Sequence, residues 1–153
     1  MPQGPQISTS ASSAAVVDPF PRVMPVLFDV GDDVIALRMV GAYQPADIRA
    51  ALGDALADPG AASPRGLLFD VRGSESLRGR PTEEVRKMGR YLASHGARYG
   101  GRLALVASEN FAYGLMRLGA ASAEAGGVSA SVFRDEPSAR AWLLATGGDS
   151  LGA

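Results

Sequence analysis

Apolar residues along this chain fall into short runs that alternate with stretches of helical periodicity. Val26–Val30 and Val34–Val40 are β-prone runs on either side of a Gly-Asp-Asp sequence, and they predict an antiparallel hairpin. Gly66–Val71 and Leu103–Ala107 are nearly continuous apolar runs, as expected for strands that are buried on both faces. Val128–Phe133 predicts a fifth strand.

Four stretches with apolar residues at helical spacing complete the pattern. The first begins at Pro45, and the second extends from about Pro81 to His95 with Thr82 expected to supply a capping oxygen. Ser108 and Asp135 are expected to cap the third and fourth helices. The side chains expected on their buried faces are Ile48, Leu52, Leu56, Val85, Met88, Leu92, Phe111, Leu115, Leu118, Ser122, Trp142 and Leu143.

The predicted order is β-β-α-β-α-β-α-β-α. Strands that are separated by helices pair in parallel through right-handed crossovers. We therefore expect an α/β fold: a single mixed, mainly parallel five-stranded sheet with an antiparallel edge hairpin and about four helices. Residues 26–145 are expected to form one domain. Residues 1–25 are interpreted as a flexible Pro/Ser-rich leader, with a role in subunit pairing as the alternative, and residues 146–153 as a frayed tail.

Composition excludes several function classes. The chain has 153 residues, of which 46% are apolar and 20% charged, and this is typical of one globular domain. It has no cysteine and a single histidine, His95, so a thiol nucleophile, a Cys-containing zinc site and a multi-His metal site are excluded. No apolar run has membrane-spanning length, and a net charge of -1 provides no drive toward nucleic acid. We expect a cytoplasmic protein with no cofactor, no nucleic-acid partner and no stable membrane insertion.

The near-neutral total conceals a charged segment. Residues 65–102 carry nine basic and four acidic side chains, net +5, while the remainder of the chain is -6. The loop after Gly66–Val71 lies at the carboxyl end of a predicted parallel strand and leads into a helix N-terminus, two features that favour anionic ligands. It predicts a site for a phosphate, a carboxylate or a phosphoprotein; the alternative is a solvated loop in a chain with fourteen Arg and one Lys. Its candidate residues are Arg72, Ser74, Ser76, Arg78 and Arg80.

Further candidates flank this loop. Asp70 ends the buried strand, either as a site carboxylate or as the partner of a nearby arginine. Glu109, Tyr113 and Arg117 follow the next strand and are expected beside the same crevice. Because Tyr113 and Arg117 are four residues apart, they share a helix face, as a polar pocket wall or as a surface pair. His95 is expected at a helix C-terminus, where an imidazole interacts favourably with the dipole, rather than as a catalytic group.

Several strings, in their order and spacing, resemble the SpoIIAA-like branch of the STAS superfamily. They are Gly66–Arg72, Gly101–Val106, Tyr113–Arg117, Val132–Asp135 and Ala141–Leu143, within about residues 26–145. The resemblance implies a domain similar to the anti-sigma-factor antagonists and related in fold to SEC14 lipid carriers. STAS antagonists carry an Asp-Ser-Ser-Gly-like turn with a phosphorylated serine. Here the strand continues as Asp-Val-Arg-Gly-Ser, so that switch is not carried over.

Three functions remain as hypotheses. The first is a non-enzymatic, regulatory module that binds a partner protein or an anionic ligand at the loop formed by residues 71–80. The alternative is a carrier of a small apolar or lipid-like molecule, with Phe111, Leu115, Met116 and Leu118 lining a cavity instead of the core. An enzyme comes third, with Asp70, Glu75 and Glu109 as a carboxylate cluster. A homodimer is also predicted, because Val26–Val30 is expected at a sheet edge.

Overall fold

The computed structural model describes residues 25–31, 33–74 and 77–145, apart from the side chain of Arg78. The predicted tail and all of the predicted leader except Pro25 lie outside the described residues.

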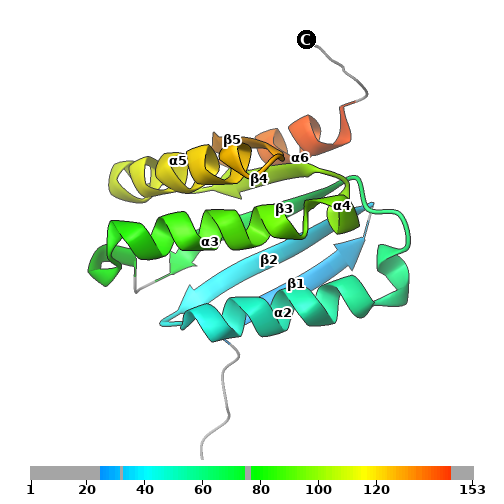
Figure 1. Ribbon diagram of the computed structural model, residues 1–153, viewed down its shortest axis with the longest axis horizontal. Helices are drawn as coiled ribbons and strands as arrows, with labels where there is room; N and C mark the ends of the chain where they lie inside the picture. The colour runs from blue at the N-terminus through cyan, green and yellow to red at the C-terminus, as the bar shows by residue number, and fades with distance from the viewer. Residues whose placement is uncertain (1–24, 32, 75–76, 146–153) are drawn as a thin grey trace, which may run out of the picture.

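One mixed sheet of five strands forms the centre of the fold (Figure 1). The strands lie side by side in chain order: β1 (Val26–Gly31), β2 (Val34–Gly41), β3 (Gly66–Ser74), β4 (Arg102–Val106) and β5 (Ser129–Phe133). β1 pairs antiparallel with β2, and every later pair is parallel. This arrangement confirms the predicted fold class, including the edge hairpin.

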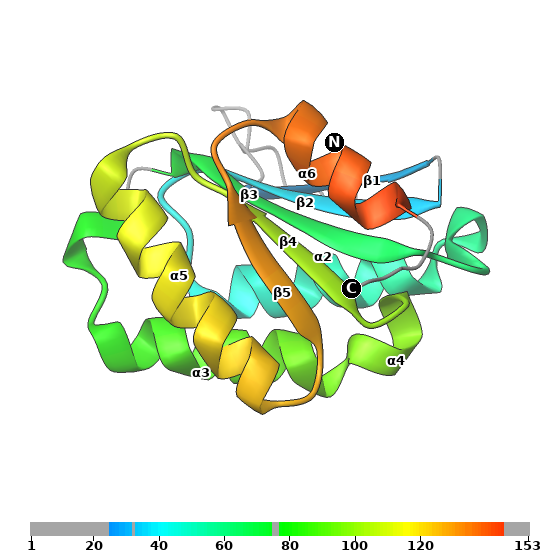
Figure 2. The ribbon, with the colours of Figure 1, turned by 90° about the horizontal axis from the view of Figure 1, so that it is seen from above.

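The helices are distributed unequally over the two faces of the sheet (Figure 2). The three crossover helices, α2 (Pro45–Ala57), α3 (Thr82–Ser94) and α5 (Asn110–Ala125), cover one face. Of the described helices, α6 (Glu136–Leu144) alone lies on the other face, and it packs on β3, β4 and β5 through Ala139 and Leu143. Two single 3-10 turns, η1 (Pro59–Ala61) and η2 (Leu77–Gly79), lie in the connections on either side of β3.

A fifth helix, α4 (Gly96–Tyr99), was not predicted. α3 ends at Ser94 with His95 as its C-cap, and α4 begins directly afterwards at Gly96, which is buried against Val128 where a Cβ atom would clash with that side chain. Gly100 ends α4 at φ +96°, a backbone conformation that favours glycine. Tyr99 is fully buried, and its hydroxyl donates a 2.8 Å hydrogen bond to the carbonyl of Leu92, which ties α4 to α3.

Two of the three predicted caps were wrong. Thr82 is already the first helical residue of α3, and Pro81 occupies the cap position without a side-chain hydrogen bond. Glu109, not Ser108, is the cap residue of α5. Asp135 caps α6 as predicted, because its carboxylate accepts a 2.8 Å hydrogen bond from the backbone N–H of Ser138.

The buried face of α5 also differs from the prediction. Its buried residues are Ala112, Met116, Gly119, Ala120 and Ala123, whereas Phe111 is 44% exposed. Helical periodicity predicts that the larger side chains of α5 are buried. Instead, small residues face α3 and allow α3 and α5 to approach closely. At the crossing point, a Cβ atom on Gly89 would clash with the carbonyl oxygen of Gly119.

This crossing generates a stability prediction. Gly89→Ala should lower the free energy of unfolding by about 1–3 kcal/mol, since the new methyl group meets backbone atoms that can move only with their helix. The matched control is Gly114→Ala on α5, where nothing lies within 4 Å of the added methyl group. That change should raise stability by about 0.5–1 kcal/mol through helix propensity. Urea unfolding measures both effects, and a Gly89→Ala protein as stable as the parent would contradict the close crossing.

Candidate functional site

Asp70 is a charged residue buried at the end of β3, 5% exposed, on the sheet face that carries α6. The Arg72 guanidinium donates two hydrogen bonds to this carboxylate: Nε donates to Oδ1 at 2.9 Å and Nη2 donates to Oδ2 at 2.8 Å. The backbone N–H of Arg72 donates a third hydrogen bond to Oδ1, at 3.0 Å. The structure therefore makes Asp70 the partner of an arginine, and the bidentate geometry satisfies its buried charge.

Glu136, the first residue of α6, extends this pair into a network. It accepts hydrogen bonds from Arg38 on β2, Nη1 to Oε1 at 2.6 Å and Nη2 to Oε2 at 3.0 Å, and from Arg140 Nε at 2.6 Å. Hydrogen bonds from Arg38 and Arg140, opposed by partial burial, lower the pKa of Glu136 to about 2. The sequence pattern does not predict this role for Glu136, although Arg38 is conspicuous as a charged residue within an otherwise apolar strand.

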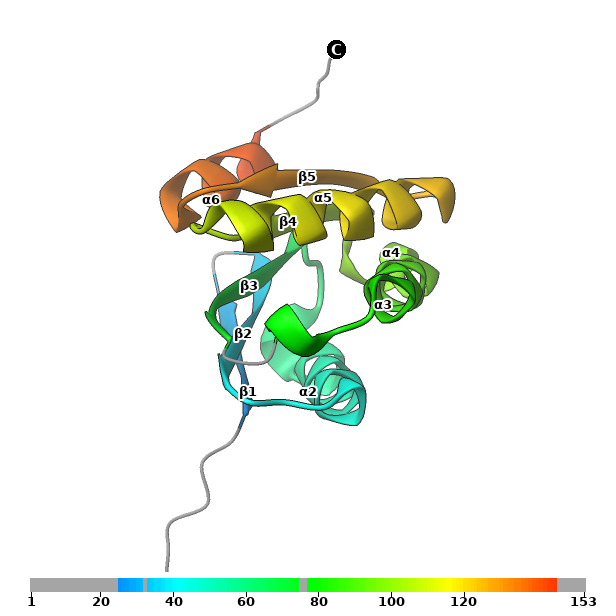
Figure 3. The same ribbon diagram turned by 90° about the vertical axis from the view of Figure 1, so that its left-hand side faces the viewer.

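A cleft of about 310 Å³ opens beside this network, at the end of the sheet where the parallel strands β3 and β4 finish. Figure 3 looks onto this end of the molecule. The cleft brings together three predicted site residues, Arg72, Ser74 and Glu109, from two separate segments of the chain. The other residues that line it are Val71, Leu77, Ser108, Phe111 and Ala112.

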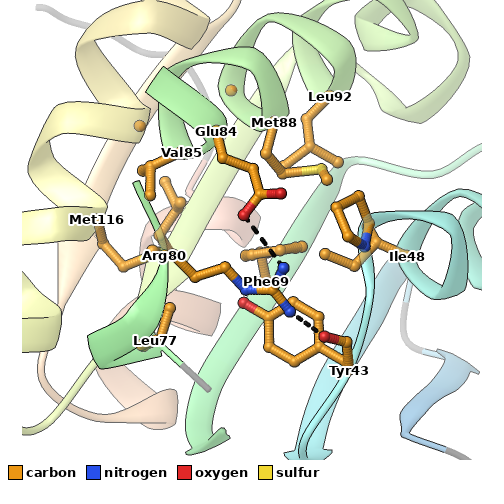
Figure 4. A pocket seen from close by; sticks show the side chains of 14 residues that line it. Tyr43, Ile48, Phe69, Leu77, Arg80, Glu84, Val85, Met88, Leu92 and Met116 are labelled. Carbon is orange, nitrogen blue, oxygen red and sulfur yellow. Dashed lines mark hydrogen bonds and ion pairs between the residues drawn. The ribbon is translucent and has the colours of Figure 1, made fainter. Parts of the chain in front are cut away.

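Arg80 is directed elsewhere, into the helix-covered side of the sheet (Figure 4). Its guanidinium lies 4.6 Å from the centroid of the Tyr43 ring, donates to the Tyr43 carbonyl, and pairs with Glu84 at 3.1 Å. Only 12% of the Arg80 side chain is exposed. Arg72 and Arg80, predicted to form one anion site, therefore lie on opposite faces of the sheet.

The remaining predicted site residues contribute little to this cleft. Tyr113 lies under Arg134, whose guanidinium carbon is 4.1 Å from the ring centroid, and it is not among the residues that line the cleft. Arg117 is exposed on α5 and is likewise outside the lining. Ser76 and the side chain of Arg78 lie outside the described residues.

A second cavity lies under Arg80 and is much smaller. Apolar side chains from the sheet, α2, α3 and α5 surround about 30 Å³, including Ile48, Phe69, Met88 and Met116 (Figure 4). This volume holds about one or two water molecules, whereas sites for small organic ligands typically measure about 300–1,000 Å³. A lipid-like cargo would have to separate α3 from the sheet before it could enter.

No family model, curated protein or solved structure matches this chain.

Two further findings concern metal ligation and the single histidine. They contain no cluster of three His, Asp or Glu side chains placed to hold a metal ion. His95 is the C-cap of α3, as expected, where Nδ1 lies 3.1 Å from Ser94 Oγ and 3.2 Å from the Tyr91 carbonyl oxygen. Within the described ranges, no helix is long and apolar enough to cross a membrane.

The pKa of Glu136 generates a pH prediction. Its arginine partners hold the folded-state pKa near 2, below the ordinary value of 4.5, so the stabilisation is complete above about pH 5 and is lost as the pH falls toward 2. With Glu136 partly exposed, we expect this contribution to be about 1–2 kcal/mol after solvent screening. Glu136→Gln should remove that amount at pH 7 and flatten the loss of stability between pH 5 and pH 3.

Urea unfolding at pH 7, 5 and 3 provides the measurement. Glu124→Gln, on the exposed side of α5, controls for the loss of one carboxylate. If both variants showed the same pH dependence as the parent, Glu136 would not anchor α6 through charge.

Proposed function

We propose that this chain is a non-enzymatic, regulatory module of the SpoIIAA-like, STAS-related type, and that it binds a protein partner in the cytoplasm through the cleft between β3 and α5. The observation that carries this proposal is the position of Phe111. This side chain is 44% exposed in the first turn of α5, and it lines a cleft of about 310 Å³.

The composition of the cleft favours a protein partner. Phe111 and Leu77 supply apolar surface, while Ser74, Ser108 and Glu109 supply hydrogen-bonding groups around it. An aromatic anchor within a polar rim is the usual composition of an energetically important protein interface. The cleft volume suits one or two inserted side chains from a partner.

A free anion is a poorer fit to the same cleft. The guanidinium of Arg72 already donates to Asp70 and Glu136, and Arg80 points to the other face of the sheet. Glu109 places a carboxylate at the start of α5. Its negative charge counteracts the attraction that the positive end of the helix dipole would otherwise exert on an anion. These charges support a partner protein over a phosphate or carboxylate ligand.

The same lining supports a non-enzymatic role. Ser74 and Ser108 bring hydroxyl groups to the cleft, but a serine nucleophile needs an adjacent base. The only histidine of the chain is at the end of α3, outside the lining, and the chain has no cysteine. The fold by itself would not decide the matter, because one fold supports many functions.

Phe111→Asp tests the proposal. The full-length parent and the variant, each with an affinity tag, would be expressed in cells of the source organism, cross-linked and purified. The proteins that co-purify with each would then be quantified by mass spectrometry. We expect the specific partners to be depleted at least about tenfold by Phe111→Asp, since loss of an aromatic anchor weakens an interface by this factor or more. Binding of the purified partner should weaken by a similar factor.

Ala121→Asp is the matched control, because it adds the same charge at an exposed position of the same helix. It should retain the partners. Recovery of the same proteins with Phe111→Asp, or equal loss with both variants, would count against a cleft-specific partner.

A further inference from the structure

The outer edge of β1 is a second surface with the features of an interface. Among the described residues, β1 pairs only with β2, in a register that aligns Leu27 with Arg38 and Phe28 with Leu37. Continuing this register aligns Pro25 with Val40, and the Val40 N–H donates a 2.8 Å hydrogen bond to the Pro25 carbonyl.

That hydrogen bond fixes which backbone groups of β1 face outward. In an antiparallel ladder, residues that exchange hydrogen bonds with the neighbouring strand alternate with residues that do not. Because Pro25 faces β2, Leu27, Asp29 and Gly31 do so as well. The N–H and C=O groups of the residues between them, namely Val26, Phe28 and Val30, point away from the sheet.

Large apolar side chains gather along the same edge. Four large hydrophobic residues are exposed in the described part of the chain, and three of them lie on β1 and β2: Leu27 at 46%, Phe28 at 40% and Val40 at 38%. Leu27 and Val40 belong to the sheet face that α6 leaves bare at this end, because α6 packs on β3, β4 and β5. Phe28 projects from the opposite face.

We propose that β1 pairs with β1 of a second copy of this chain, antiparallel, about a two-fold axis at Phe28. This axis pairs the whole strand: Phe28 lies opposite Phe28 of the second copy, and Val26 lies opposite Val30. Every outward-facing backbone group then meets another outward-facing group, as strand addition to an exposed edge requires.

Charge is compatible with this self-pairing. Asp29 is the only charged residue of β1, and in this register it lies opposite Leu27 of the second copy. No like charges are therefore directly opposed, an arrangement that would otherwise be destabilising. The two Phe28 rings cover one another, and Leu27 loses its exposure on the other face.

The dimer goes beyond the proposed function of the cleft and is independent of it. The two sheets would join into one ten-stranded sheet. Since the two-fold axis reverses the direction of the parallel strands, the two clefts would lie at opposite ends of the assembly. Two partners would then bind without touching each other.

Sedimentation velocity of the full-length protein over micromolar to submillimolar concentrations tests the dimer. We expect the parent to approach twice the 15.8 kDa mass of the chain. Phe28→Pro should weaken dimerisation at least about tenfold, because proline removes the N–H at the axis, while that N–H is not needed for pairing with β2. Phe28→Asp should have the same effect by opposing two carboxylates. Phe111→Asp is the control and should remain dimeric.

Cysteine substitution tests the register, because the chain contains no cysteine of its own. Opposed residues of a hydrogen-bonded antiparallel pair have Cα atoms about 5.5 Å apart, within the range of a disulfide. Under mild oxidation, Phe28→Cys should form a covalent dimer at least about tenfold faster than Leu27→Cys, which does not lie opposite its own copy.

A monomeric parent would overturn the proposal, including the case in which another part of the chain occupies the β1 edge. Equal cross-linking at positions 27 and 28 would overturn the register. Loss of partner binding in Phe111→Asp with an intact dimer would separate the two proposals.

Discussion

The strands of this sheet are laid down in chain order, and the rest of the structure depends on that constraint. Each parallel connection from β2 to β5 is a right-handed crossover, and because the strand order never reverses, every crossover delivers its helix to the same face. α2, α3 and α5 therefore share one face and must pack tightly beside one another. Of the described helices, only α6, a helix of nine residues that follows β5 in the chain, lies on the opposite face.

The hydrogen-bonded network of Arg38, Asp70, Arg72 and Glu136 adds to the apolar contacts that hold α6 on that face. α6 fully buries Ala139 and Leu143, and Trp142 and Leu144 are partly buried against the same cluster, so a helix of nine residues has a small apolar face with which to hold its place on the sheet. Glu136 at its first turn joins α6 to β2 through Arg38 and approaches Asp70 through Arg72. A buried carboxylate such as Asp70 is costly unless it is fully paired, so removing one partner destabilises more than the pair contributes. The network thus fixes the position of α6 rather than adding to the bulk of the core.

The sequence pattern predicts the strands and the crossover helices because apolar periodicity records which positions are buried. It does not predict features that depend on close approach. The spacing predicts a helix end before Gly96 but not that a side chain there would clash with Val128. Phe111 fits a helical stripe, but Ala112 and Gly119 are the residues that α5 buries. The site follows the same division. Chain order places Arg72 and Glu109 at one end of the sheet. The packing of Arg80 against Tyr43, on the other face, depends on a tertiary contact that cannot be predicted from the spacing of neighbouring residues.

The exposure of Phe111, a residue that helical spacing predicts to be buried, links the packing of the helices to the candidate site. Three helices on one face leave room for α5 only if small side chains face α3, and Gly89 and Gly119 provide that closeness. With small residues facing α3, the side chain of Phe111 in the first turn of α5 faces outward and lines the cleft that begins where β3 ends. The exposed part of the other face has the same origin, because no crossover helix reaches it and, among the described residues, nothing covers Leu27 there. Both surfaces proposed to bind partners are therefore consequences of one strand order.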